Sequence, residues 1–157
     1  MSRKEFSVLV KRIQQELDEI RIVIARAHNA WEHARRSNDD LYLDSVALNL
    51  HGFYSGFERI FTQIAEIVDD DLPRGENWHE LLLLQMTSNT LVIRPAVIST
   101  ETGRLLDELR RFRHVVRNVY MHKFIPENVG KLLKFADEAY ERLQTELTAF
   151  TDFLEQA

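Results

Sequence analysis

The sequence predicts an all-α protein, folded as an antiparallel bundle of about five helices. In several long segments the apolar residues recur at alternating steps of three and four positions, which is the spacing of one helix face. Short polar or proline-containing breaks separate these segments. The chain has 157 residues, of which 45% are hydrophobic and 29% charged. We therefore expect one soluble globular domain that spans residues 1–157.

The first two expected helices are long and lie directly one after the other. The first begins at Phe6 and ends near Arg35 and Arg36, because basic residues suit a helix C-terminus. A polar turn at 37–40 offers helix caps. The second helix has the denser apolar stripe, so we expect it to be central. Its stripe comprises Val46, Leu50, Phe53, Phe57, Ile60, Ile64 and Ile67.

Breaks in the pattern separate the other three helices. Residues 69–76 contain proline and glycine and predict a loop, after which Asn77 and Glu80 resemble a capping box for a short helix to about residue 87. Residues 90–98 predict a connector. Ser99 is a candidate cap for the fourth helix, which should end between residues 121 and 124, because Pro126 favours the start of a new helix. The last helix runs to the end of the chain.

The basic residues concentrate in the fourth helix. Residues 110–124 contain five Arg or Lys and no acid, and two of the six histidines. Residues 104–123 hold six basic and two acidic residues, net +4, whereas the whole chain carries −5. On a helix, Leu105, Leu109, Phe112, Val116 and Val119 share an apolar face, and Arg110, His114, Arg117 and Met121 fall on roughly the opposite side. An acidic body with one basic stripe predicts a local anion site rather than a surface that binds nucleic acid everywhere.

Several protein classes are excluded by what the sequence lacks. There is no cysteine, so disulfides, thiolate zinc sites and cysteine nucleophiles are excluded, which suits a reducing cytoplasm. The N-terminus has no signal-peptide pattern, and no apolar run approaches the length of a membrane span. The motifs of P-loop nucleotide hydrolases, serine hydrolases and zinc metalloproteases are absent. We expect a cytoplasmic protein with no metal or cofactor.

The candidate catalytic residues are Arg117, Asn118 and His122, in the pattern R-N-x-x-x-H. An arginine followed by a histidine at similar spacing also occurs elsewhere in this chain, so spacing alone is weak. The copy at Arg117 differs by its polar neighbour Asn118, its basic helix and the proline-started helix that follows. The alternative is a solvated arginine paired with an acid and a histidine that interacts with the helix dipole.

Other polar residues are candidates for supporting roles. Arg110, Arg113, His114 and Lys123 are candidate RNA or phosphate ligands, although an exposed polar face is the alternative. Glu76 and His79 form one E-x-x-H, half of the pattern of di-iron bundles, and we interpret this lone copy as a helix-capping feature.

The chain resembles the HEPN superfamily, and within it the HepT-like ribonuclease toxins. The resemblance is carried by residues 53–59 and 113–118 and by Arg117, Asn118 and His122, which match the family's R-x4–6-H motif. It implies a metal-independent endoribonuclease toxin of a toxin–antitoxin pair. It also implies a homodimer whose two motifs share one cleft, and a small antitoxin partner, a nucleotidyltransferase of the MNT type.

The residue types fit such chemistry. RNA cleavage without a metal requires a base for the 2′-hydroxyl, an acid for the departing 5′-oxygen and a cation for the phosphorane charge. Histidine can serve either proton-transfer role, but one imidazole cannot easily serve both at once, so two His122 side chains across a two-fold axis would suffice. The planar guanidinium of Arg117 suits the phosphate.

One position departs from the resemblance. HepT-like toxins commonly carry H-x-Y, in which the partner transfers AMP to the tyrosine, whereas this chain has Phe124 there. Tyr120 is the nearest tyrosine and a second candidate for modification; we expect the partner to block the site by binding instead. The competing hypothesis for the whole chain is a non-catalytic helical module that binds a nucleotidyltransferase.

Overall fold

The computed structural model describes residues 3–90, 92–118 and 124–157, with side chains except at 113–118. The described chain forms five helices: α1 (Arg3–Ser37), α2 (Asp40–Ile67), α3 (Trp78–Thr87), α4 (Thr100–Asn118) and α5 (Pro126–Gln156). The predicted all-α class and the five predicted helices are confirmed. The predicted end of the fourth helix, between residues 121 and 124, falls almost entirely outside the described residues.

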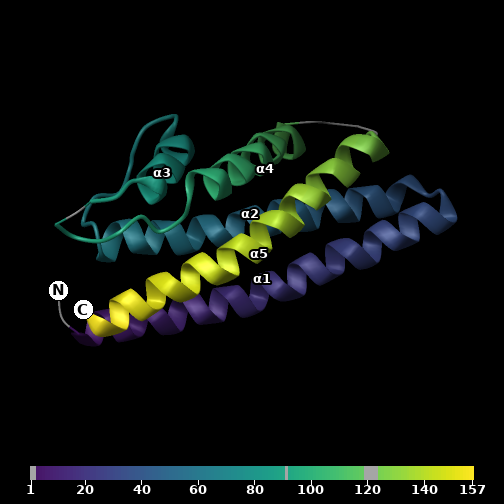
Figure 1. Cartoon of the computed structure of the whole chain (residues 1–157). Helices are drawn as coiled ribbons and strands as arrows, with labels where there is room; N and C mark the ends of the chain where they lie inside the picture. The colour runs from purple at the N-terminus through teal and green to yellow at the C-terminus, as the bar shows by residue number, and fades with distance from the viewer. Residues whose placement is uncertain (1–2, 91, 119–123) are drawn as a thin grey trace.

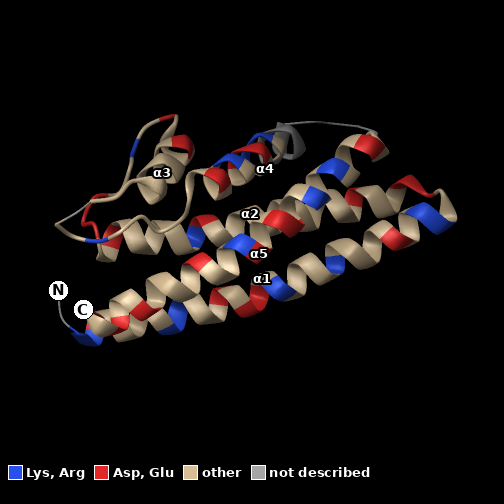
Figure 2. Cartoon of the chain, viewed as in Figure 1, with Lys and Arg blue, Asp and Glu red and all other residues tan. Residues whose placement is uncertain are grey.

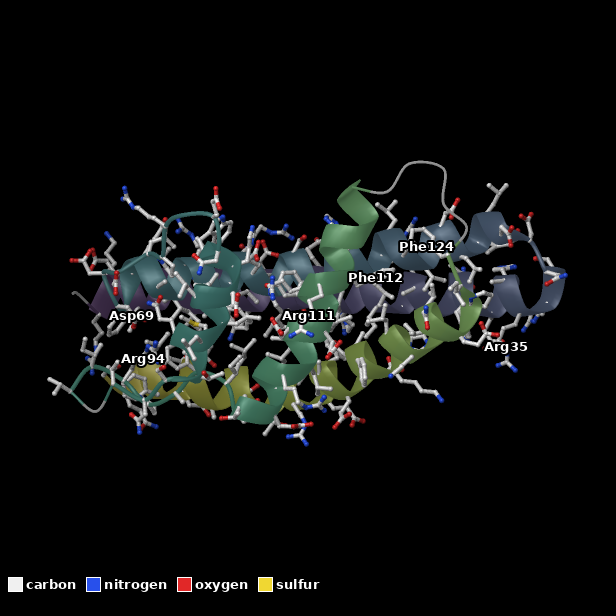
Figure 3. The ribbon with its side chains drawn as sticks, turned by 90° about the horizontal axis from the view of Figure 1, so that it is seen from above. Arg35, Asp69, Arg94, Arg111, Phe112 and Phe124 are labelled. Atoms are coloured by element: carbon white, nitrogen blue, oxygen red, sulfur yellow. The ribbon has the colours of Figure 1, made fainter. Side chains whose placement is uncertain are left out.

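α1, α2 and α5 run along the bundle, with α1 opposite in sense to α2 and α5 (Figure 1), whereas α4 crosses them at a steep angle (Figure 3). α1 and α2 form an antiparallel hairpin, and α5 crosses α1 so that both chain ends lie at the same end of the bundle. α4 packs against α2 and α5, and the short α3 covers α2 and α4. The N-terminal turns of α5 lie toward the end of the bundle at which α1 joins α2 (Figure 1).

The helix boundaries follow local capping chemistry. Asp39 begins α2, because its carboxylate accepts a hydrogen bond of 3.0 Å from the backbone N–H of Leu41. Ser99 precedes α4 and its hydroxyl accepts a bond of 3.2 Å from the backbone N–H of Thr102. Pro126 is the first residue of α5, where the missing N–H has no cost. All three predicted boundary signals are confirmed.

The predicted capping box at Asn77 is wrong. Asn77 does precede α3, but its side chain makes no capping hydrogen bond. The chain enters α3 through Gly75, whose φ of 102° lies in the left-handed region that glycine tolerates, and whose carbonyl accepts a 3.3 Å bond from Trp78. His79 is also not a capping residue, because its ring contacts Glu58 on α2.

The core is one continuous apolar cluster with α2 at its centre, as predicted. Its largest fully buried side chains include Tyr54, Phe53, Phe57, Phe61 and Leu50, all from α2. α1 approaches α2 closely at Gly56, where a Cβ atom would lie 2.6 Å from Cγ1 of Ile20. Burial of this stripe supplies the main driving force for the bundle.

The connector between α3 and α4 is held by a buried arginine. Arg94 forms two hydrogen bonds of 2.6 and 2.7 Å with the carboxylate of Asp69, and its side chain has no exposed surface. Its remaining N–H groups bond to the carbonyls of Ser88, Pro95 and Gln85. Figure 3 shows Arg94 beside Asp69 at one end of the bundle. The predicted connector thus has irregular structure, is held in place by the hydrogen bonds of Arg94, and leads directly into α4.

Candidate active site

α4 carries the candidate motif and is anchored through a broad apolar face. Leu105 and Leu109 are buried and Phe112 is half-buried, as predicted. Leu106 and Thr102 are also fully buried, so the packed face is wider than the sequence pattern indicated. Val116 and Val119 belong to the residues whose side chains are not described.

The basic residues in the first part of α4 are paired along the helix. Arg104 bonds to Glu101 at 2.6 Å, and that hydrogen bond lowers the pKa of the Glu101 carboxyl. Arg110 bonds to Asp107 at 2.8 Å, and Arg111 contacts the same carboxylate at 3.0 Å. Figure 2 shows these acidic and basic positions together on α4. Neighbouring carboxylates therefore offset the upstream positive charge.

Arg110 does not lie on a solvent-facing cationic side as predicted. Only 24% of its side chain is exposed, and Asp107 satisfies its guanidinium. The reason is that the packed face of α4 extends to Leu106, one turn before Arg110. Its expected role as a phosphate ligand remains a prediction.

Arg113 and Arg117 differ from the upstream arginines in their sequence surroundings. No Asp or Glu stands three or four positions before or after either residue. The intrahelical ion pairs that occupy Arg104, Arg110 and Arg111 are thus not available to Arg113 and Arg117. This weakens the interpretation of Arg117 as a helix arginine paired with a local acid.

The structure places part of the predicted site. Arg117 and Asn118 occupy the last described turn of α4, and the backbone of Arg113 and His114 lies one turn earlier. Their side chains are not described. Tyr120, His122 and Lys123 lie outside the described residues, so their predicted roles remain predictions.

Phe124 has a packing contact in the structure. Its ring centroid lies 5.8 Å from that of Phe112, and both side chains pack against the core cluster (Figure 3). This contact helps to join α4 to the residues that lead into α5.

A largely buried polar pair between α2 and α3 was not predicted. The Nδ1 atom of His79 on α3 lies 2.6 Å from a carboxylate oxygen of Glu58 on α2, and only 8% of the Glu58 side chain is exposed. Glu58, Tyr54 and His51 lie on one face of α2 at helical spacing, and each makes further contacts. Glu58 falls within the apolar stripe of α2, between Tyr54 and Phe61, and this charged residue was the signal in the sequence.

The described part of the chain has neither a cluster of metal ligands nor a helix suited to crossing a membrane. No group of three His, Asp or Glu residues there is arranged to hold a metal ion. No helix there combines the length and apolar character that crossing a membrane requires.

Comparison with models of protein families shows to which family the chain belongs. The model of a family described as HepT-like protein matches residues 45–154, more than half of the sequence. The chain belongs to the HepT-like family. The match includes α3, α4 and nearly all of α5, and thus Arg117, Asn118 and His122, whereas α1 precedes it. No curated protein and no solved structure matches the HepT-like chain.

Proposed function

We propose that this HepT-like protein is a metal-independent endoribonuclease, the toxin of a toxin–antitoxin pair. The observation that carries the proposal is the R-N-x-x-x-H motif, which begins at Arg117 in the last described turn of α4 and lies within the segment that matches the HepT-like family. The resemblance to HEPN ribonuclease toxins rests on the same motif together with residues 53–59 and 113–118. A homodimer brings two copies of the motif to one cleft.

The two histidines divide the proton transfers. His122 of one copy removes the proton from the 2′-hydroxyl, and His122 of the other gives a proton to the departing 5′-oxygen. Both roles suit imidazole, whose unperturbed pKa is about 6.5. A single motif supplies only one such group, which is the chemical reason for a site shared by two copies.

The other candidate residues bind and orient the phosphate. Arg117 offers a planar pair of N–H donors to the phosphorane oxygens, and Asn118 adds an uncharged donor next to it. Arg113, His114 and Lys123 extend the positive surface along the RNA backbone. Arg110 joins them only by exchanging its bond to Asp107 for a phosphate.

The partner of the proposed toxin is a nucleotidyltransferase of the MNT type that covers the cleft. Phe124 has no hydroxyl to accept AMP, and its packing against Phe112 suits a structural role. Tyr54, which is 1% exposed, offers no accessible acceptor. Transfer to Tyr120 is the second possibility for this partner.

Growth during expression tests the proposed function. Expression of the unmodified protein should arrest a bacterial host, and the His122→Ala and Arg117→Lys variants should not, because they lose the proton-transfer group and the bidentate fork. Soluble yield and helical content, measured for each variant, control for misfolding. Equal arrest by all three proteins would overturn the assignment.

A second candidate function is a helical module that binds the nucleotidyltransferase without cleaving RNA. The five Arg and Lys residues of 110–124 favour it, because a basic segment can hold an anion without any chemistry. In that case neither the unmodified protein nor the His122→Ala variant would cleave RNA, and both would bind the partner. If the chain is the proposed toxin, both proteins should bind the partner but only the unmodified protein should cleave RNA.

The proposed site requires two copies of the chain. Sedimentation at micromolar concentration should therefore give about twice the 18.5 kDa of one chain. A strict monomer under conditions in which RNA is cleaved would contradict a site built from two His122 side chains.

A further inference from the structure

An open cavity lies between the second half of α1 and the first turns of α5. Its volume is about 620 Å³. Trp31 of α1 and Gly130 of α5 line it. A Cβ atom at Gly130 would lie only 2.8 Å from Cη2 of Trp31. Glycine at this position therefore lets the half-buried indole sit against α5 in the wall of the cavity.

Two lysines of α5 also line this cavity. Among the described residues, neither Lys131 nor Lys134 has a carboxylate within ion-pair distance. The Lys131 ammonium lies 5.7 Å from the ring centroid of Phe135, a contact that leaves it open to an anion. The rim thus offers two positive charges beside an aromatic side chain.

The acidic residues of the cavity are mostly engaged. Asp137 contacts Nε2 of His28 at 2.6 Å, and Glu32 lies 4.0 Å from the guanidinium of Arg35. Glu127, in the first turn of α5, is the third acid of the lining. The two lysines therefore share the cavity with three carboxylates, of which those of Asp137 and Glu32 already contact other side chains and that of Glu127 has no such contact among the described residues.

The cavity also lies close along the chain to the proposed catalytic histidine. Pro126 lines it and follows His122 by four residues. Four residues span at most about 14 Å even when fully extended. Along the chain, His122 is therefore within the length of a few nucleotides of the edge of the cavity.

We propose that the cavity between α1 and α5 binds nucleotides of single-stranded RNA that flank the cleaved bond. A base packs against Trp31, and Lys131 and Lys134 contact phosphates. An aromatic side chain combined with unpaired cations is the arrangement by which proteins hold single strands without reading sequence. The inference rests on the proposed ribonuclease function and adds a flanking subsite to it. Trp31 precedes the segment that matches the family, so this chain supplies the aromatic wall from α1.

Tryptophan fluorescence tests the subsite without any need for cleavage. The chain has two tryptophans, and Trp78→Phe leaves Trp31 as the sole reporter. In the His122→Ala background, addition of a short single-stranded RNA should quench Trp31 saturably. The reciprocal Trp31→Phe protein, with Trp78 as reporter, should show no saturable change. If fluorescence anisotropy shows that labelled RNA binds while the emission of Trp31 stays constant, the proposed subsite does not exist.

Paired lysine variants test the phosphate contacts. Lys131→Gln with Lys134→Gln should weaken binding of the single strand about tenfold or more at low salt and reduce the salt slope by about 1.4, because each lost phosphate contact to a single strand removes about 0.7. Lys4→Gln with Lys11→Gln makes the same change in net charge near the opposite end of α1 and should have a much smaller effect. Equal losses in both pairs would overturn the subsite.

The two proposals fail separately. The subsite is measured by RNA binding to the His122→Ala protein, whereas the ribonuclease proposal is measured by cleavage with His122 present. If the unmodified protein cleaves RNA but RNA does not quench Trp31 fluorescence, only the proposed subsite is overturned. Saturable quenching without any cleavage by the unmodified protein would overturn the ribonuclease proposal and keep RNA binding at this cavity.

Discussion

RNA cleavage by the His122→Ala protein should be at least about a hundredfold slower than cleavage by the unmodified protein. A positioned acid or base contributes about 10² to 10⁴ in rate. The substitution removes both the acid and the base if the two motifs meet across a dimer. Single-turnover cleavage of a labelled RNA, with protein in excess, measures this rate.

His33→Ala is the matched control for this loss. His33 is an exposed histidine whose ring stacks on Tyr42, with 5.0 Å between ring centroids, where α1 meets α2. Its removal changes the histidine count equally but should leave the cleavage rate within about twofold. Equal rates for the His122→Ala and unmodified proteins, with both folded, would mean that His122 takes no part in the chemistry.

Arg94→Met should lower the free energy of unfolding by about 3–5 kcal/mol, the typical cost of removing one partner of a buried ion pair. The Asp69 carboxylate, of which 8% is exposed, would lose its cation, and three backbone carbonyls would lose donors. Urea unfolding near pH 7, followed by circular dichroism, measures the change. Arg74→Met alters an exposed arginine of the neighbouring loop and should change stability by under about 0.5 kcal/mol.

A double variant separates charge burial from packing. Asp69→Asn combined with Arg94→Met removes both charges and should recover part of the loss, because no unpaired ion remains buried. A loss in Arg94→Met no larger than in Arg74→Met would show that the ion pair does not hold the connector in solution.

The periodic parts of the fold were predictable from sequence, and the parts that depend on distant contacts were not. Apolar spacing located α1, α2 and α5, because each buries one stripe in a shared core. Arg94 stands in a segment without periodicity, and its partner Asp69 lies 25 positions earlier. Only the folded connector brings these two side chains together.

The candidate site was predictable to a similar extent. The placement of Arg117 and Asn118 on α4 follows from the helix pattern, whereas the predicted helix end between residues 121 and 124 stays a prediction. The pairing of Arg110 with Asp107 was missed, because the sequence pattern assigned too few residues to the packed face of α4 and put Arg110 on the solvent side. The contact of Glu58 with His79 depends on how α3 folds back over α2, which local sequence does not encode.

Mapping the ends of the RNA products is the most direct test of the central claim. Purified protein, incubated with single-stranded RNA in excess EDTA, should leave 2′,3′-cyclic phosphate and 5′-hydroxyl ends, because the 2′-hydroxyl is the nucleophile and the 5′-oxygen departs. A 2′-deoxy substitution at the cleaved nucleotide should abolish the cut. Products with 3′-hydroxyl and 5′-phosphate ends, or cleavage that requires an added divalent metal, would contradict a site built from Arg117, Asn118 and two His122 side chains.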